Sequence, residues 1–338
     1  MEVSTATGSV SSDVQLSYSR SEGDVSPDDV EWKHKENEVW HLNKDGKEND
    51  PNSYYRYTAT STNLRGKKYM EDKKKYPSKE AAYSLVCCKC FQTDHKMLHS
   101  AESIKSLQSF LKENQDKEFF IINWLVPGGH YTVVNLYVRT LPHGEDEIFD
   151  ALLVKYRMGD DTFRSERFKF ICDLLEAPAA ILTMANTMLG GLRPALIGQK
   201  LTAHHFTGDN YLEIDVDTGS SSIVSFATRS IVRTFSSIVA NIGFVIEGRD
   251  EGELPERMLA IHQYGRVDID KIAMKYDYVP PEAKAEAKKK SEGKSKSRGY
   301  SLMSFFGRGS QTGTESSSKS KGSGCESDVE RGQREKLL

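Results

Sequence analysis

The sequence lacks any long hydrophobic run. No segment approaches the roughly 20 consecutive apolar residues that a helix needs to cross a bilayer. The first residues, MEVSTATGSVSSDVQL, also lack the basic start and apolar core of a secretory signal. We therefore do not expect a membrane-spanning or secreted protein. A cytoplasmic location is predicted, with peripheral contact with a membrane left open.

An excess of charge of one sign is lacking as well. In 338 residues, 46 Lys and Arg stand against 49 Asp and Glu, which gives a formal net charge of -3. Without an overall positive field, nucleic-acid binding is not expected. The sequence also lacks the glycine-rich phosphate-binding and dinucleotide-binding strings and the G-x-S-x-G string of many hydrolases. These observations suggest no cofactor.

Cysteine is scarce, and its spacing does not suggest a disulfide framework. The number is odd, and three of the five lie within four positions. We predict reduced thiols at all of them: Cys87, Cys88, Cys90, Cys172 and Cys325.

Apolar periodicity is missing from both ends of the chain. Residues 1–52 are mostly small, polar or charged, and residues 279–338 are rich in Lys, Ser and Gly after Pro280-Pro281. Such segments bury too little apolar surface to offset the entropy that ordering costs. We predict disordered tails on either side of one folded domain at 53–278.

The middle of the chain carries strand patterns. Residues 118–127 and 130–140 are rich in aromatic and β-branched residues and flank Gly128-Gly129, which predicts a hairpin. Further strands are predicted at 150–158, 167–175, 196–206, 210–218 and 243–249, and short helices at 79–86, 101–113 and 253–265.

One long helix is predicted at 220–242. Apolar residues recur three or four positions apart from Val224 to Ile242, and Ser220 is a suitable N-cap. At 1.5 Å per residue such a helix would be roughly 30 Å long, enough to cross a small sheet. The expected fold class is α+β, with a curved, mainly antiparallel β-sheet packed against this helix.

Three carboxylates alternate with apolar residues in the strand predicted at 210–218. On a strand, Glu213, Asp215 and Asp217 share one face, where they could bind a divalent cation or act as acid and base. The alternative is a solvated face, or one neutralised by neighbouring cations. The string at 217–220, D-T-G-S, is also found in aspartic proteases, but their chemistry needs a second carboxylate from another copy, which this sequence lacks.

A Cys/His cluster has the number and type of ligands for tetrahedral zinc. Its spacing, Cys87-x2-Cys90-x4-His95-x3-His99, is similar to that of a zinc knuckle. A buried patch of reduced cysteines explains the same residues.

Two basic clusters stand out against the balanced composition. The first contains Lys67, Lys68, Lys73–Lys75 and Lys79, with Tyr69 and Tyr76 between them, and could hold phosphate groups of a lipid. In the second, Lys288–Lys290 and further cations precede an aromatic stretch at 300–306, which suits weak docking on an anionic membrane or a partner protein. Solvated loops and tails are the alternative for both.

Several strings resemble, in order, the C-terminal domain family of the plant protein "enhanced disease resistance 2". They are LRGKKYMEDKKKYPS (64–78), FFIINWLVPGGHYTVV (119–134), GDDTFRSERFKF (159–170), HFTGDNYLEIDVDTGSS (205–221) and GFVIEGRDEGELPERMLA (243–260). Among the family-pattern positions are Asp160, Asp161, Tyr211, Glu213, Asp215 and Asp217. A stand-alone form of the domain is expected, because the family's pleckstrin-homology and START companions would not fit in the segment upstream.

The resemblance implies no catalytic chemistry and a link to membranes. Our leading hypothesis is a non-enzymatic lipid-binding or peripheral membrane module. In this hypothesis, apolar acyl chains are held between the sheet and the long helix. The candidates for binding the head group or another anion are Arg65, Lys67, Lys68, Arg164 and Arg167. A charge network at one end of the sheet could also form among Asp160, Asp161, Arg164, Arg167, Lys169, Glu213, Asp215 and Asp217. Two alternatives stay open: a scaffold that recruits partner proteins through its C-terminal tail, and metal-assisted hydrolysis by Glu213, Asp215 and Asp217.

Overall fold

The computed structural model describes residues 30–32, 53–56, 59, 62–128, 131–188 and 194–283. The elements up to Pro280 belong to one compact unit. The tails predicted to be disordered, at 1–52 and 279–338, lie almost entirely outside the described residues, as does the basic and aromatic cluster at 288–306.

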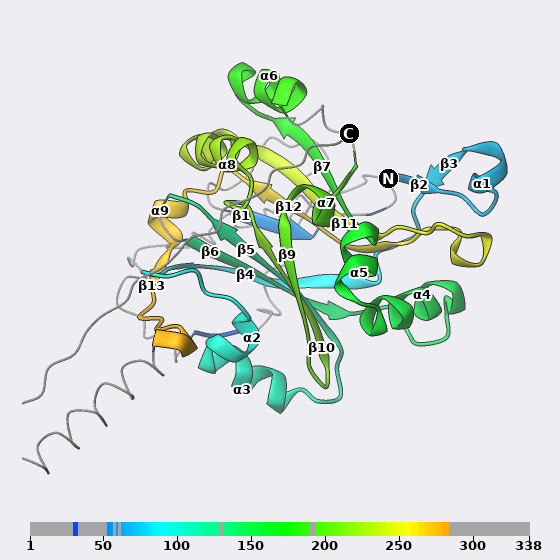
Figure 1. Cartoon of the computed structure of the whole chain (residues 1–338), viewed down its shortest axis with the longest axis horizontal. Helices are drawn as coiled ribbons and strands as arrows, with labels where there is room; N and C mark the ends of the chain where they lie inside the picture. The colour runs from blue at the N-terminus through cyan, green and yellow to red at the C-terminus, as the bar shows by residue number, and fades with distance from the viewer. Residues whose placement is uncertain are drawn as a thin grey trace, which may run out of the picture. The chain divides into compact units, whose positions relative to one another are not determined.

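A large mixed sheet organises the described chain (Figure 1). Its order is β8-β7-β11-β12-β4-β6-β5-β10-β9, with β1 pairing to β12 and β13 to β4. Pairing is antiparallel except for β10 with β5, β12 with β4 and β13 with β4, so the expected mainly antiparallel sheet is confirmed. The strands are β1 Ser53–Arg56, β4 Tyr83–Gln92, β5 Phe119–Val126, β6 Tyr131–Arg139, β7 Phe168–Glu176, β8 Ala195–Leu196, β9 Thr202–Thr207, β10 Tyr211–Asp217, β11 Val239–Ile246, β12 Met258–Gly265 and β13 Met274–Lys275.

The sheet curls into a half-barrel. Phe120 on β5 lies 6.0 Å from Phe244 on β11, measured between ring centroids, although β6, β4 and β12 separate these strands in the sheet. Only a strongly curved sheet brings such strands together. Phe168 on β7 stacks on Phe244 at 5.5 Å, so aromatic rings fill the concave side.

Helices cover both faces of this sheet. On one face, α2 Ser100–Ser103 and α3 Lys105–Glu113 pack their buried residues against β5 and β6, close to the helix predicted at 101–113. The others are α1 Tyr69–Asp72, α4 Glu147–Met158, α5 Asp161–Arg167, α6 Ala179–Met188, α7 Ile197–Lys200, α8 Ser222–Thr234, α9 Ile269–Ile272 and the short 3-10 turns η4 Phe235–Ser237 and η5 Glu251–Glu253.

The prediction of one long helix at 220–242 was wrong. The helix α8 ends at Thr234, and the residues from Val239 onward form β11. All eight residues of β11 are buried, and the strand bonds to β7 on one side and to β12 on the other. Val239–Ile242 therefore form a strand because they pair and pack within the sheet, although their spacing alone would also allow a helix.

Other element predictions were also wrong. Residues 150–158 were expected to be a strand, but they belong to α4, which buries Phe149, Leu152, Leu153 and Tyr156 at helical spacing. The segment predicted as a helix at 253–265 contains β12, and the one predicted at 79–86 contains the start of β4. The segment 196–206 is split by α7.

A separate two-stranded hairpin projects from the sheet (Figure 1). It consists of β2 Asn63–Arg65, α1 and β3 Lys75–Pro77, and we call residues 63–77 the basic hairpin. Lys73 ends α1 in the left-handed conformation, with φ 56°. Gly66 has no room for a side chain, because a Cβ there would lie 2.4 Å from the ring of Tyr76. This close approach joins the two strands.

Candidate functional site

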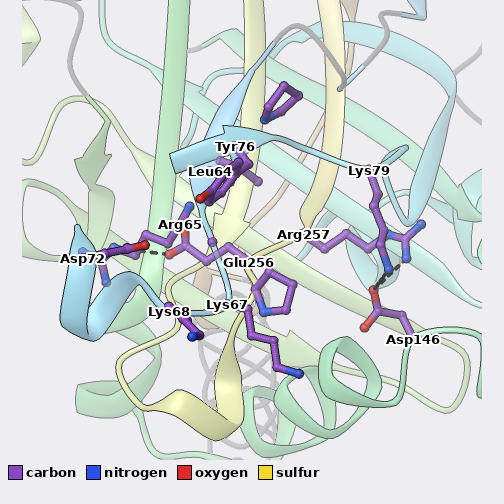
Figure 2. Close-up of a pocket in the computed structure, with 13 residues that line it drawn as sticks. Leu64, Arg65, Lys67, Lys68, Asp72, Tyr76, Lys79, Asp146, Glu256 and Arg257 are labelled. Carbon is purple, nitrogen blue, oxygen red and sulfur yellow. Dashed lines mark hydrogen bonds and ion pairs between the residues drawn. The ribbon is translucent and has the colours of Figure 1, made fainter. Parts of the chain in front are cut away.

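A pocket of about 380 Å³ lies between the basic hairpin, the loop after η5 and the start of α4 (Figure 2). Five cationic side chains line it, together with three carboxylates. The cations are Arg65, Lys67, Lys68, Lys79 and Arg257, and the carboxylates are Asp72, Asp146 and Glu256. The structure thus brings together three of the five predicted anion-binding residues, Arg65, Lys67 and Lys68.

Arg65 anchors the basic hairpin to the sheet. Its Nη1 donates to the Gly248 carbonyl at 2.8 Å, and its Nη2 lies 3.1 Å from Glu247. Its backbone N–H donates to Glu256 Oε2 at 3.1 Å. These contacts engage the guanidinium group of Arg65 with the sheet. They also fix the backbone from which Lys67 and Lys68 extend.

Glu256, which lines the pocket, belongs to a buried network of paired charges. Lys169 Nζ lies 2.6 Å from Glu256 and 3.3 Å from Glu247, and all three residues are buried. Buried ions persist only when they are paired and hydrogen-bonded. Because the charge of Glu256 is offset by Lys169 and Arg65, it does not repel an anion above it as an isolated carboxylate would.

On the other side of the pocket, Arg257 and Lys79 converge on Asp146 (Figure 2). Arg257 Nη1 donates to Asp146 Oδ2 at 2.8 Å, and its Nε donates to the Glu80 carbonyl at 2.9 Å. Lys79 lies 3.5 Å from the same carboxylate, with its side chain 65% exposed. Arg257 is therefore structural, while Lys79 remains accessible.

Lys67 and Lys68 carry the free positive charge of the site. Both are exposed, and neither has an ion-pair partner among the residues that the structure describes. An ammonium group is a compact donor of three hydrogen bonds and a common ligand of phosphate. Together with Lys79, they give the pocket a surplus of positive charge at its mouth.

The other two predicted anion-binding residues lie elsewhere. Arg167 pairs with Glu253 and donates to the Glu247 carbonyl, and it is buried. Arg164 donates to the carbonyls of Tyr156 and Arg157, at 3.2 and 2.5 Å. Both guanidinium groups therefore hold the chain together around α5.

The family-pattern residues Asp160 and Asp161 also serve α5. Asp160 is its N-cap and accepts a hydrogen bond from the backbone N–H of Phe163 at 2.7 Å. Asp161 is exposed and lies 3.8 Å from Arg164. Asp160 therefore caps a helix, and of the two aspartates only Asp161 has an ion pair with an arginine among the described residues.

The carboxylate row on β10 is buried under the loop that leads into α2. Glu213 and Asp215 are completely buried, so the alternative of a solvated face was wrong. Glu213 accepts hydrogen bonds from the backbone N–H and the hydroxyl of Ser100, at 2.6 and 2.5 Å, and from the Ala101 N–H at 3.0 Å. The row acts as an anchor for this loop.

The neighbours of Glu213 complete the anchor. Asp215 accepts from the His99 backbone N–H at 2.6 Å, and Asp217 pairs with Lys96 at 2.6 Å. Tyr211 meets the His99 ring through its hydroxyl at 2.9 Å. The row thus binds the segment 96–101 of its own chain and is not joined to Arg164 or Arg167, so the single charge network that we expected is two separate sets.

The structure does not bring the four zinc candidates together. Cys87 belongs to the apolar cluster on one face of the sheet and Cys90 to the cluster on the other, while His95 is exposed. Within the described residues, no three Cys, His, Asp or Glu side chains form a group that could hold a metal ion. Burial raises the pKa of the Cys87 and Cys88 thiols to about 12, which keeps them protonated.

Comparison with known proteins places the fold and its pocket in a family. The family described as "Protein ENHANCED DISEASE RESISTANCE 2, C-terminal" matches residues 55–268. The chain belongs to this family. The match includes every residue that lines the pocket, and it confirms the resemblance that the sequence strings indicated.

A curated relative supports the same assignment. "Protein ENHANCED DISEASE RESISTANCE 2-like" from Arabidopsis thaliana is 27% identical over 229 residues, which cover 68% of this chain and 30% of the relative. The chain therefore matches less than one third of the length of that relative. No solved structure matches this member of the enhanced disease resistance 2 C-terminal family.

Sequence reasoning missed Asp146, Glu256 and Arg257 as pocket residues. They lie 67 to 192 positions away from the residues Arg65 to Lys79 in the chain, and no spacing pattern links them to the basic hairpin. Glu256 and Arg257 stand within the string E-L-P-E-R, which the resemblance did single out. That string alone did not indicate what its charges contact.

Proposed function

We propose that this chain is a non-enzymatic peripheral membrane module that binds the phosphate-bearing head group of an anionic lipid in the pocket beside the basic hairpin, at the cytoplasmic surface of a membrane. The observation that carries the proposal is the group of accessible lysines at the pocket mouth, Lys67, Lys68 and Lys79, in a hollow of about 380 Å³. Pockets for small ligands have volumes of roughly 300–1,000 Å³.

The pocket suits a head group because some of its cations form its walls while others remain available to bind an anion. Arg65 and Arg257 are committed to internal carboxylates and carbonyls, so they shape the hollow. Lys67 and Lys68 project at its mouth, where charge-assisted hydrogen bonds to phosphate oxygens would form. Each lysine close to an anionic surface contributes about 1 kcal/mol of attraction.

The acyl chains belong outside the fold in this proposal. The concave side of the half-barrel is filled by Phe120, Phe168 and Phe244, whose ring centroids lie 5.5–6.5 Å apart. The long helix that would have enclosed acyl chains is replaced by α8 and β11. Binding at the membrane surface is therefore favoured over carriage of a whole lipid. No helix of the described residues is long and apolar enough to cross a membrane.

Vesicle sedimentation tests the proposal. The charge reversals Lys67→Glu and Lys68→Glu together are expected to weaken binding to phosphatidylcholine vesicles that contain a phosphoinositide or phosphatidylserine by at least about tenfold. The matched control is Lys112→Glu with Lys275→Glu, which makes the same change of net charge at exposed lysines outside the pocket. Equal loss in both double variants, or no loss in the first, would contradict a site at the basic hairpin.

A further inference from the structure

The helix α6 differs from the other helices in composition. No charged residue occurs between Glu176 and Arg193, a stretch that contains the whole helix. Its inner side packs on the core through Ile181, which is 5% exposed, and Met184. Its outer side carries no charge either, because the residues described there as exposed are Ala179, Ala180, Leu182 and Thr183. A surface helix normally presents charged and polar residues to solvent.

The described chain covers only part of this helix. Figure 1 shows α6 beyond the end of β7, beside α8, with which it is in contact. Leu182 remains 37% exposed, and Leu175, at the end of β7, is 49% exposed. These two leucines lie on consecutive elements, and contiguous exposed apolar surface marks a contact with a partner or a membrane.

Charged residues on α8, which contacts α6, indicate whether α6 meets a partner protein or a membrane. Arg229 and Arg233 on α8 are exposed, and neither has an ion-pair partner among the residues that the structure describes. The acidic residues on β7 just before α6 are Asp173, which is exposed, and Glu176, whose charge is offset by Arg266. Apolar residues flanked by unpaired arginines are the composition of helices that lie in the surface of an anionic bilayer.

We propose that α6 inserts its outer face into the interfacial layer of an anionic bilayer, with Arg229 and Arg233 on the phosphate groups. The helix has 10 residues, so it is about 15 Å long at 1.5 Å per residue and lies in one leaflet rather than spanning the membrane. This inference rests on the proposed peripheral membrane function, to which it adds the element that enters the apolar layer.

A fluorophore attached to the full chain tests this insertion. The environment-sensitive nitrobenzoxadiazole group is attached to Leu182→Cys in a Cys325→Ser background. Burial raises the pKa of Cys87, Cys88 and Cys172 to about 12 and raises that of Cys90 well above its usual value, so these thiols stay unlabelled. The matched control is Val154→Cys, which lies on α4 and is 61% exposed.

The probe at position 182 is expected to gain intensity severalfold and shift to shorter wavelength with vesicles of phosphatidylcholine and phosphatidylserine, while the probe at 154 does not. Leu182→Glu without a label is expected to weaken vesicle binding by roughly tenfold, the effect of losing one buried leucine. Arg229→Glu with Arg233→Glu should weaken binding to these vesicles as well.

Three results would overturn the insertion. Vesicle-bound protein whose probe at 182 does not change would place α6 in water and leave the lysine pocket as the contact. A wild-type chain that binds no vesicles would remove both proposals. Sedimentation equilibrium showing a dimer that Leu182→Glu converts to a monomer would make a second copy of the chain the partner of α6.

Discussion

Glu213 and Asp215 lie two residues apart on the same face of β10, and both side chains are completely buried. Burial, followed by the charge of Glu213, raises the pKa of Asp215 well above its usual range. The raised pKa favours the protonated form of Asp215, and the neighbouring Glu213 accepts three hydrogen bonds from Ser100 and Ala101.

This protonation predicts how stability depends on pH. A group whose folded pKa is raised stabilises the fold fully below its unfolded pKa, about 4 for Asp, and loses that contribution as the pH rises towards the folded value. Asp215→Asn, which cannot ionise, should lack this loss. The free energy of unfolding of the variant relative to the wild type should increase with pH, by at most about 1.4 kcal/mol per unit. Urea unfolding between about pH 4 and 8 measures the difference, and parallel pH profiles would contradict a neutral Asp215.

Glu213→Gln should destabilise the protein, because it removes part of a hydrogen-bonded anchor. The variant keeps one oxygen for the Ser100 and Ala101 donors and replaces the other with an amide, so it should unfold about 3 kcal/mol more easily. Amide hydrogen exchange should accelerate at Ser100 and Ala101. Glu102→Gln is the control, since that side chain is 67% exposed. Unchanged exchange at both amides would show that the row is not an anchor for the loop.

Asp146 pairs with Lys79 at the pocket, so removing the charge of Asp146 should increase the affinity of the pocket for anions. Asp146→Asn keeps an effective N-cap for α4 but removes the charge that holds Lys79. Affinity for inorganic phosphate and for anionic vesicles should increase severalfold, at a cost of about 1–2 kcal/mol from the lost pair with Arg257. Isothermal titration with phosphate measures the gain. Asp161→Asn, outside the pocket, should have no effect on affinity.

Glu253 predicts a loss of stability in acid. Burial alone would raise its pKa, but hydrogen bonds from the Arg249 N–H, Lys155 and Arg167 lower the pKa to about 2. A lowered folded pKa gives stability above the unfolded value, about 4.3, that is lost as the pH falls towards 2. Glu253→Gln should therefore unfold about 2 kcal/mol more easily at neutral pH, and the difference should shrink below about pH 4.

The control for this prediction is Glu251→Gln, which is exposed in the same 3-10 turn. Thermal unfolding of the two variants at several pH values separates them. If both variants lose the same stability at neutral pH, the ion pairs with Lys155 and Arg167 do not contribute.

The cysteines of the sheet should react slowly with alkylating reagents in the folded protein. Because burial raises the pKa of the thiols of Cys87, Cys88 and Cys172 to about 12, iodoacetamide at about pH 8 should leave them unmodified in the folded protein and modify them after denaturation. Peptide mass mapping measures this directly. Rapid alkylation of Cys87 in the native chain would contradict its place in the apolar cluster.

Part of the fold could be predicted from local patterns. The hairpin at 118–140 was predicted because aromatic and β-branched residues flank Gly128-Gly129, and β5 and β6 pair there. The segment 253–265 was misassigned because β12 is buried on both faces and shows no alternation. The strand at 150–158 was predicted from an apolar run alone, whereas the N-cap of the helix found there, Asp146, lies outside that run.

By itself, the sequence determined the family, the mixture of strands and helices, and the basic character of residues 64–79, because motifs and composition are local properties. Only the tertiary structure decided which charges are free. Arg65 and Arg167 read as equal candidates along the chain, yet both are committed to buried partners, whereas Lys67 and Lys68 remain in solvent. The same holds for Glu213 and Asp215, whose burial comes from a loop more than 100 positions away. The ionisation and availability of a side chain depend on neighbours that only folding supplies.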